Sequence, residues 1–247
     1  MTCTCSFVTL NLARFDEVRS VPAIAASCRA GDPVAWAVGC DEQAAGSDPG
    51  SQRAFEWIAI GLHADAASAH AVIDAGSDAV PYMSDAAETW SAVLAPFNHR
   101  GAVNWLDAAA PGPAFPVGAS ASEGGDAATG PFAVITSAGW NIGADFDVNR
   151  ALEFGAGVER VRSSMSSVDG MHSHQVFAFP GLFAFDALTL TFWRDDASMR
   201  SFAYRPGTHK TQLDNFRANE TADRTSFTRL RALRHTGSWH GTDPLAG

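Results

Sequence analysis

Hydrophobic and polar residues follow regular patterns through the C-terminal part of the chain. Residues Phe185–Trp193 alternate as in a strand, and Asp195–Tyr204 repeat with the period of a helix. Pro206–Gly207 interrupts this pattern, and a second helix is expected from Thr208. A last strand ends in Gly237–Trp239. This stretch therefore predicts a strand, two helices and a strand.

The same kind of pattern extends back to residue 132. We expect, in chain order, a strand at Phe132–Trp140, a helix at Asp147–Met165, strands at His174–Phe179 and Phe185–Trp193, the two helices, and a strand at Thr225–Thr236. Strand, helix, strand, strand, helix, strand is the order of the split βαβ, or ferredoxin-like, arrangement.

The first half of the chain carries a weaker copy of this pattern. Phe7–Phe15 and Phe132–Trp140 both have the composition of opening strands, 125 positions apart. Asp65 lies 130 positions before Asp195, and each Asp is expected to cap a helix. The buried positions expected after the caps are Ala69, Val72 and Ile73 in one copy and Met199, Phe202 and Ala203 in the other. We therefore predict an α+β fold, a duplicated ferredoxin-like arrangement in one chain that closes into a barrel of the dimeric α+β type.

Two tracts lack periodicity. Asp41–Arg53 is rich in Gly, Ser and acidic residues, and Ala108–Pro131 is mostly Ala, Gly, Pro and Ser. We predict a linker at residues 108–131 between an N-terminal half, residues 1–107, and a C-terminal half, residues 132–247. The first helix of the N-terminal half is expected at Val18–Arg29.

The formal net charge of −10 lies entirely in the first half. Residues 1–130 carry 5 basic and 15 acidic groups, whereas residues 131–247 carry 12 of each. A net acidic chain without basic tracts is a poor partner for nucleic acid. Between Arg200 and Arg234, however, eight cations face three anions, which favours an anionic ligand or an acidic protein partner.

No apolar run approaches the roughly 20 residues of a membrane-spanning helix. Residues 1–10 lack the basic and apolar segments of a secretory signal, so we expect a cytoplasmic protein without a transmembrane segment. The four cysteines, at positions 3, 5, 28 and 40, are expected to be reduced, and a metal site at Cys3 and Cys5 is disfavoured.

His209 is the first residue that could carry chemistry. With Leu213 and Phe216 it occupies positions i, i+4 and i+7 of the second helix, so the three share one face. An imidazole in such a stripe is either a core histidine bonded to a loop or a ligand. Neutral imidazole suits iron, and haem needs a large apolar slot, so the second alternative is an axial haem ligand.

Arg162 falls near the middle of the apolar arc expected on the helix Asp147–Met165. That arc consists of Val148, Ala151, Leu152, Phe154, Gly155, Val158, Val161 and Met165. A buried guanidinium requires an anion, such as a propionate, a substrate carboxylate or a buried Asp, unless it snorkels or forms an internal salt bridge. Gly155 and Gly157 are poor helix formers, which favours a bulky group packed close to them.

Aromatic residues near these positions, including Trp193, could line a macrocycle or form ordinary core. His172 and His174 alternate onto one strand face, but no third ligand lies at a useful spacing. Hydrolase and nucleotide-binding motifs are absent from the sequence.

Four segments together resemble one known family. They are FVTLNLARF (Phe7–Phe15), TLTFWRDDAS (Thr189–Ser198), AYRPGTHKTQL (Ala203–Leu213) and FTRLRALRHTGSW (Phe227–Trp239). They are similar to the spheroidene monooxygenase family, haem-dependent carotenoid oxygenases of photosynthetic bacteria and their relatives. The likeness is good over roughly residues 130–245 and thin before them; the acidic Asp41–Arg53 tract and the enlarged tract at 108–131 depart from it.

This resemblance implies haem b in the C-terminal half with His209 as the axial ligand. It also implies a haem-dependent monooxygenase acting on a small or apolar organic substrate. Trp193, Phe216 and Arg162 would contact the cofactor, and Arg162 would pair with a propionate or polarise a bound oxygen species. Electrons would come from a separate reductase or ferredoxin.

Two alternatives stay open. Aldoxime dehydratases look similar in architecture and use ferrous haem as a Lewis acid for dehydration at nitrogen, without dioxygen. A non-catalytic haem-binding protein could use the same barrel.

Overall fold

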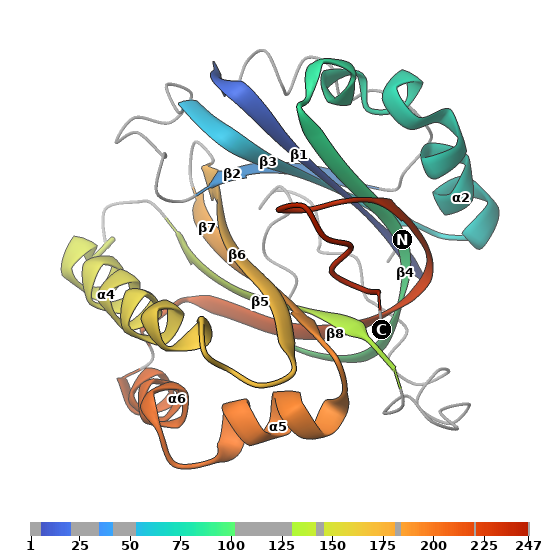
Figure 1. Ribbon diagram of the computed structural model, residues 1–247. Helices are drawn as coiled ribbons and strands as arrows, with labels where there is room; N and C mark the ends of the chain where they lie inside the picture. Colours follow the sequence, from blue (N-terminus) through green and yellow to red (C-terminus); the bar gives the residue numbers. More distant parts are fainter. Residues whose placement is uncertain are drawn as a thin grey trace.

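Eight antiparallel strands close into a barrel in the computed structural model, which describes residues 6–20, 35–41, 53–101, 130–141, 146–180, 184–219 and 221–246 (Figure 1). The strands are β1 (Phe7–Ser20), β2 (Ala35–Asp41), β3 (Arg53–His63), β4 (Glu88–Gly101), β5 (Phe132–Asn141), β6 (Met171–Pro180), β7 (Ala184–Trp193) and β8 (Arg224–Gly237). They follow one another around the barrel as β1-β3-β2-β6-β7-β5-β8-β4. The predicted α+β class is confirmed.

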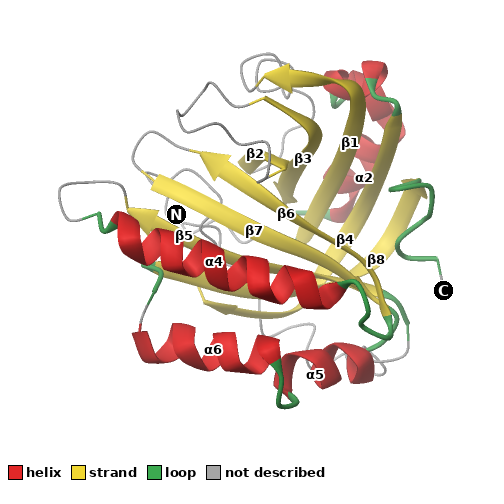
Figure 2. Cartoon of the chain, turned by 60° about the vertical axis from the view of Figure 1, so that its left-hand side comes forward, coloured by secondary structure: helices red, strands yellow, loops and turns green. Residues whose placement is uncertain are grey.

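The helices lie outside this barrel in two groups. The first group contains α2 (Ala66–Ala75) with the short 3₁₀ helices η2 (Gly76–Asp78) and η3 (Pro81–Asp85). The second contains α4 (Val148–Met165), α5 (Asp196–Tyr204) and α6 (Thr208–Asn219), which lie together beside the C-terminal strands (Figure 2). No helix among the described residues is long and apolar enough to cross a membrane.

Strand order repeats along the barrel. The strands of the first half run β4-β1-β3-β2, and those of the second half run β8-β5-β7-β6. Both runs have the order of a ferredoxin-like sheet. They join where Cys40 and Asp41 pair with Ala178 and Phe177, and along most of the length of β4 and β8.

Side chains alternate along each strand between the interior of the barrel and its outer face, and both sets are part of the core. Leu10, Ile60 and Leu190 point into the barrel and belong to one fully buried cluster. The opposite faces pack under the helices; for example, Phe132 and Trp193 meet Met199 of α5.

The two predicted N-caps are confirmed. The Asp65 carboxylate accepts a hydrogen bond from the backbone N–H of Ser68 at 2.8 Å, and the Asp195 carboxylate accepts one from Ser198 at 2.7 Å. The expected buried positions follow each cap, except that Phe202 is only half-buried.

Some expectations differ from the structure. β1 continues to Ser20, so the helix expected from Val18 does not begin there, and residues 21–34 lie outside the described residues. Most of the acidic tract and of the predicted linker also lies outside them. On α4, Val161 and Met165 of the expected apolar arc are buried as predicted, but Leu152 is 66% exposed, and the helix also buries Gly157, which lay outside that arc.

The sequence did not predict what Ser238–Ala246 does. This C-terminal strap crosses one end of the barrel (Figure 1), and Trp239 and Leu245 join the interior cluster. The Glu88 carboxylate accepts hydrogen bonds from Ser238 Oγ at 2.8 Å and from the backbone N–H of Gly241 at 2.7 Å. Glu88 thus fixes the strap to β4.

Candidate functional site

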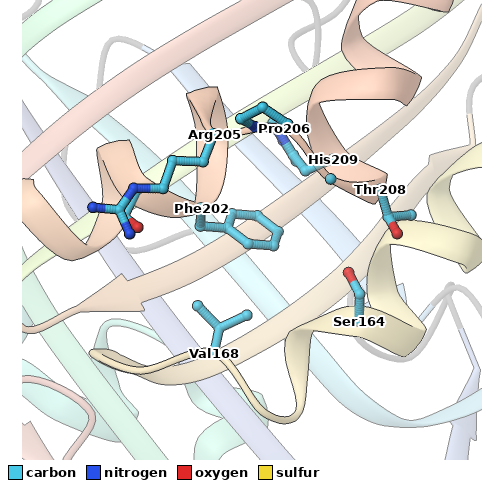
Figure 3. A pocket seen from close by; sticks show the side chains of 9 residues that line it. Ser164, Val168, Phe202, Arg205, Pro206, Thr208 and His209 are labelled. Carbon is cyan, nitrogen blue, oxygen red and sulfur yellow. The ribbon is translucent and has the colours of Figure 1, made fainter.

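A cavity of about 230 Å³ opens where α5 meets α6, beside the C-terminal end of α4 (Figure 3). Its lining residues are Ser164, Val168, Ser201, Phe202, Arg205, Pro206, Gly207, Thr208 and His209. The PGTHK element that stood out in the sequence therefore forms one wall of this cavity.

The chain turns sharply between the two helices because of Pro206. The residue before a proline is pushed out of the helical region, and Arg205 has an extended backbone, with φ of −71° and ψ of 149°. α5 ends at Tyr204, and α6 starts at Thr208, two residues after Pro206. His209 consequently sits in the first turn of α6, next to the last turn of α5.

The imidazole of His209 has a defined orientation. Its Nδ1 lies 3.2 Å from the carbonyl oxygen of Ala203, so Nδ1 carries the proton and donates it. Its ring packs on the ring of Phe202, with 4.7 Å between centroids. Burial lowers the pKa of His209, although the bond to Ala203 opposes this effect. The side chain is therefore neutral at pH 7, and Nε2 has no hydrogen-bond partner in the described part of the chain.

The described ring contacts connect Trp193 to His209 indirectly, because Phe202 packs between them. Its ring is 2% exposed and lies 5.6 Å from the Phe202 ring, and its indole N–H donates to Thr191 Oγ1 at 2.8 Å. Trp193 thus supports the cavity floor from beneath and does not line the cavity.

Phe216 joins α6 to α4. Its ring stacks on the ring of Phe154, with 4.7 Å between the centroids. The rings of Phe154 and Trp140 meet edge to face, with 4.9 Å between their centroids. A Cβ on Gly157 would lie 2.8 Å from Phe216 Cζ, so this glycine allows the close contact. The predicted bulky neighbour is confirmed for Gly157, whereas a Cβ on Gly155 would have no atom within 4 Å.

The structure places Arg162 away from the His209 cavity lining. Its side chain is 26% exposed and forms an ion pair with Glu159 at 2.7 Å, one turn earlier on α4. It also lies near His174, whose pKa is lowered mainly by burial and further by the Arg162 and His240 charges. The internal salt bridge is therefore the alternative that the structure favours for Arg162.

The outer face of the sheet near α4 carries small side chains. Ala138, Ala187 and Ala178 pair across β5, β7 and β6, and Thr136 pairs with Thr189 in the next row. Thr136 is exposed although β5 lies between two other strands. Ala138, Ala178 and Ala187 are buried, so among these positions only Thr136 is exposed to solvent.

The other histidines and cysteines considered as metal ligands do not form a metal site among the described residues. Among residues that the structure describes, no three His, Cys, Asp or Glu side chains form a metal-binding group. A bulge between Met171 and Ser173 interrupts the alternation of β6, and His172 bonds the Pro244 carbonyl oxygen at 3.0 Å. Cys3, Cys5 and Cys28 lie outside the described residues.

The implied haem can be tested against these residues. A metal-binding histidine usually holds one ring N–H on a carbonyl or carboxylate and offers the other nitrogen to the metal, as His209 does. The cavity of about 230 Å³ is smaller than the ~300–1,000 Å³ typical of ligand sites. The donor group therefore fits haem iron, but the cavity does not enclose a whole tetrapyrrole.

No protein-family model and no curated protein matches the chain in sequence. Among solved structures, the chain is similar to an aldoxime dehydratase in complex with butyraldoxime, with a TM-score of 0.55 and 15% identity, over 92% of this chain and 80% of that one. A second aldoxime dehydratase gives a TM-score of 0.54 and 12% identity, over 92% and 82% of the two chains. An anthrone oxidase-like protein gives a TM-score of 0.36 and 10% identity, over 94% and 93%, which is too low to support an argument. The first two similarities show a common fold.

Proposed function

We propose that this protein is a haem-dependent enzyme in which His209 is the axial ligand of the iron. The observation that carries the proposal is the neutral His209 imidazole beside an aromatic ring: it is bonded at Nδ1 to Ala203, and its Nε2 has no partner among the described residues. The activity we favour is a monooxygenase similar to spheroidene monooxygenase, acting on a small or apolar organic substrate.

The chain's own residues would hold and shield the group. Haem b, when bound, would supply an iron centre that activates a small molecule. Phe202, supported by Trp193, would exclude water on the His209 side, and Phe216 would do so near α4. Thr136 and Thr189 would offer hydroxyl groups from the sheet. Arg162 would reach a ligand only by leaving Glu159, so we give it a secondary catalytic role.

Haem binding on this scheme requires α6 to move outward from α4. The described links between the two helices are the stack of Phe154 on Phe216 beside Gly157 and the hydrogen bond from Arg160 to Gln212, and the α5–α6 turn at Pro206–Gly207 is exposed. Release of these links would enlarge the cavity toward the small residues of the outer sheet face.

The direct test is an absorption spectrum after addition of haem. We expect a Soret band that shifts when carbon monoxide is added to the reduced protein, and loss of that band in His209→Ala. His70→Ala, a half-buried histidine on α2, is the matched control and should behave as wild type. If the wild-type protein retains no Soret band after unbound haem is removed, the proposal is refuted.

A dehydratase of the aldoxime dehydratase type is the second candidate. It is favoured by the fold shared with two aldoxime dehydratases over 92% of this chain. Such an enzyme would convert butyraldoxime into butyronitrile and water under anaerobic reducing conditions. The monooxygenase would instead require dioxygen and electrons from a separate reductase or ferredoxin. A non-catalytic haem-binding protein would transfer haem rapidly to an apo-acceptor and show neither turnover.

We further propose that the two halves arose by internal duplication. The repeated strand order and the N-caps at Asp65 and Asp195 support this origin. The division at a linker of residues 108–131 and a cytoplasmic location remain predictions.

A further inference from the structure

We propose that Arg205 binds a carboxylate at the mouth of the His209 cavity. The carboxylate belongs either to a haem propionate or to a free organic acid that enters the same cavity. The propionate source rests on the proposed function, whereas the free acid does not.

Arg205 is a cation without a carboxylate partner in the described part of the chain. It is exposed and lines the cavity that contains His209 (Figure 3). Neighbouring cations already have carboxylates: Arg194 has Asp169 and Asp195, Arg200 and Arg229 share Asp196, and Lys210 has Asp214. The positive charge offered to an incoming anion at this cavity is therefore that of Arg205.

The remaining lining suits an acid with an apolar body. Phe202, Val168 and Pro206 form an apolar wall, and the Phe202 ring lies between Arg205 and the opposite end of the cavity (Figure 3). At that end the side chains of Ser164 and Thr208 extend toward each other. A ligand with its carboxylate on Arg205 would lay its apolar part on Phe202.

The sequence suggested Arg162 as the partner of a ligand carboxylate, and we assign this role to Arg205 instead. The guanidinium of Arg162 is already paired with Glu159 and lies outside the cavity lining. A guanidinium binds a carboxylate with two parallel N–H bonds. Arg205 has no ion pair with a described carboxylate that would have to be broken first.

The test compares ligands that differ only in the acid. Wild type, Arg205→Gln and Arg205→Lys are titrated with haemin and with haemin dimethyl ester, followed by absorbance, and with benzoate and benzamide, followed by calorimetry. Arg200→Gln, an exposed cation on α5, is the control. Because Arg205 is exposed, all variants should unfold at the wild-type temperature.

We expect Arg205→Gln to bind haemin or benzoate about tenfold more weakly, as for one lost charge-assisted hydrogen bond. Arg205→Lys keeps the charge but cannot form two parallel N–H bonds, so its affinity should lie between those of the wild type and Arg205→Gln. The ester and the amide should not respond to residue 205. A haemin response identifies the propionate, and a benzoate response identifies a free acid. If the wild type binds benzoate through Arg205 but does not bind haemin, the proposed function fails and this inference stands. If neither acid responds to residue 205, the inference is wrong.

Discussion

His209 is oriented by the backbone of Ala203, whose carbonyl oxygen lies 3.2 Å from the Nδ1 atom. A backbone acceptor cannot be removed by mutating a side chain, so the ring orientation depends on the turn between α5 and α6. The position of Nε2 is therefore set by local chain geometry that the PGTHK sequence encodes.

The first prediction concerns pH. Burial lowers the pKa of His209 from its usual 6.5, so protons compete with iron for Nε2 only at lower pH than at an ordinary histidine. We expect haem binding, followed by the Soret band, to persist as pH falls below 6.5. A loss of the band with a midpoint at or above 6.5 would contradict this expectation.

Two glycines on α4 should respond in opposite directions to alanine. Gly157→Ala would place a Cβ 2.8 Å from Phe216 Cζ and 3.0 Å from Gln212 Oε1, and should destabilise the protein by about 1–3 kcal/mol. Gly155→Ala meets no atom within 4 Å and should stabilise it by about 0.5–1 kcal/mol. Urea denaturation measures both, and a stable Gly157→Ala variant would show that α4 and α6 separate easily.

Glu88 should be the main attachment of the C-terminal strap. Burial alone would raise its pKa, but hydrogen bonds from Gly241, Ser238, Arg14 and His240 lower it to about 2. Its stabilisation is therefore complete above the usual pKa of 4.5 and is lost as pH falls toward 2.

We expect Glu88→Gln to cost about 2–3 kcal/mol at pH 7 and to speed hydrogen exchange at the Gly241 amide. The control, Glu159→Gln, removes an exposed carboxylate paired with Arg162 and should cost less than about 1 kcal/mol. Equal losses in the two variants would show that the strap is held mainly by its apolar residues.

His63 should make stability depend on pH in a higher window. The ring is fully buried between Thr9 Oγ1 at 3.0 Å and Ser68 Oγ at 2.9 Å, and burial lowers its pKa to about 4 despite the nearby Asp65 charge. Between pH 6.5 and 4 the unfolded chain binds a proton that the folded chain does not. Stability should therefore fall by up to about 3 kcal/mol as pH drops through this window. His63→Leu should be less stable at pH 7 and show a flatter profile from pH 6.5 to 4.

Much of the fold was accessible from the sequence because its signals are local. Asp65 and Asp195 cap helices in the same way since each carboxylate needs only the N–H three residues later. The strands β5 and β7 begin and end within about one residue of the predicted bounds because alternation marks their buried faces.

The features that were missed depend on contacts that the periodicity of the sequence does not mark. Glu88 meets the strap about 150 positions later, and no local pattern marks that partner. Arg162 was expected to lie buried, but Glu159, at the neighbouring helix position, offers it a carboxylate at the surface. Arg205 stands directly before the Pro206–Gly207 break and four residues before His209. Its place in the segment AYRPGTHK could therefore have marked it as a cation near His209.

The barrel joins its two runs of strands along two unequal seams. At one, β4 and β8 pair from Trp90 with Gly237 to Gly101 with Ser226; at the other, the described pairs of β2 and β6 are Cys40 with Ala178 and Asp41 with Phe177. A barrel opens most easily between the two strands that share the fewest backbone hydrogen bonds. Among the described strands, thermal fluctuations should therefore separate β2 from β6 while β4 and β8 act as the hinge, which gives this part of the barrel one preferred line of opening.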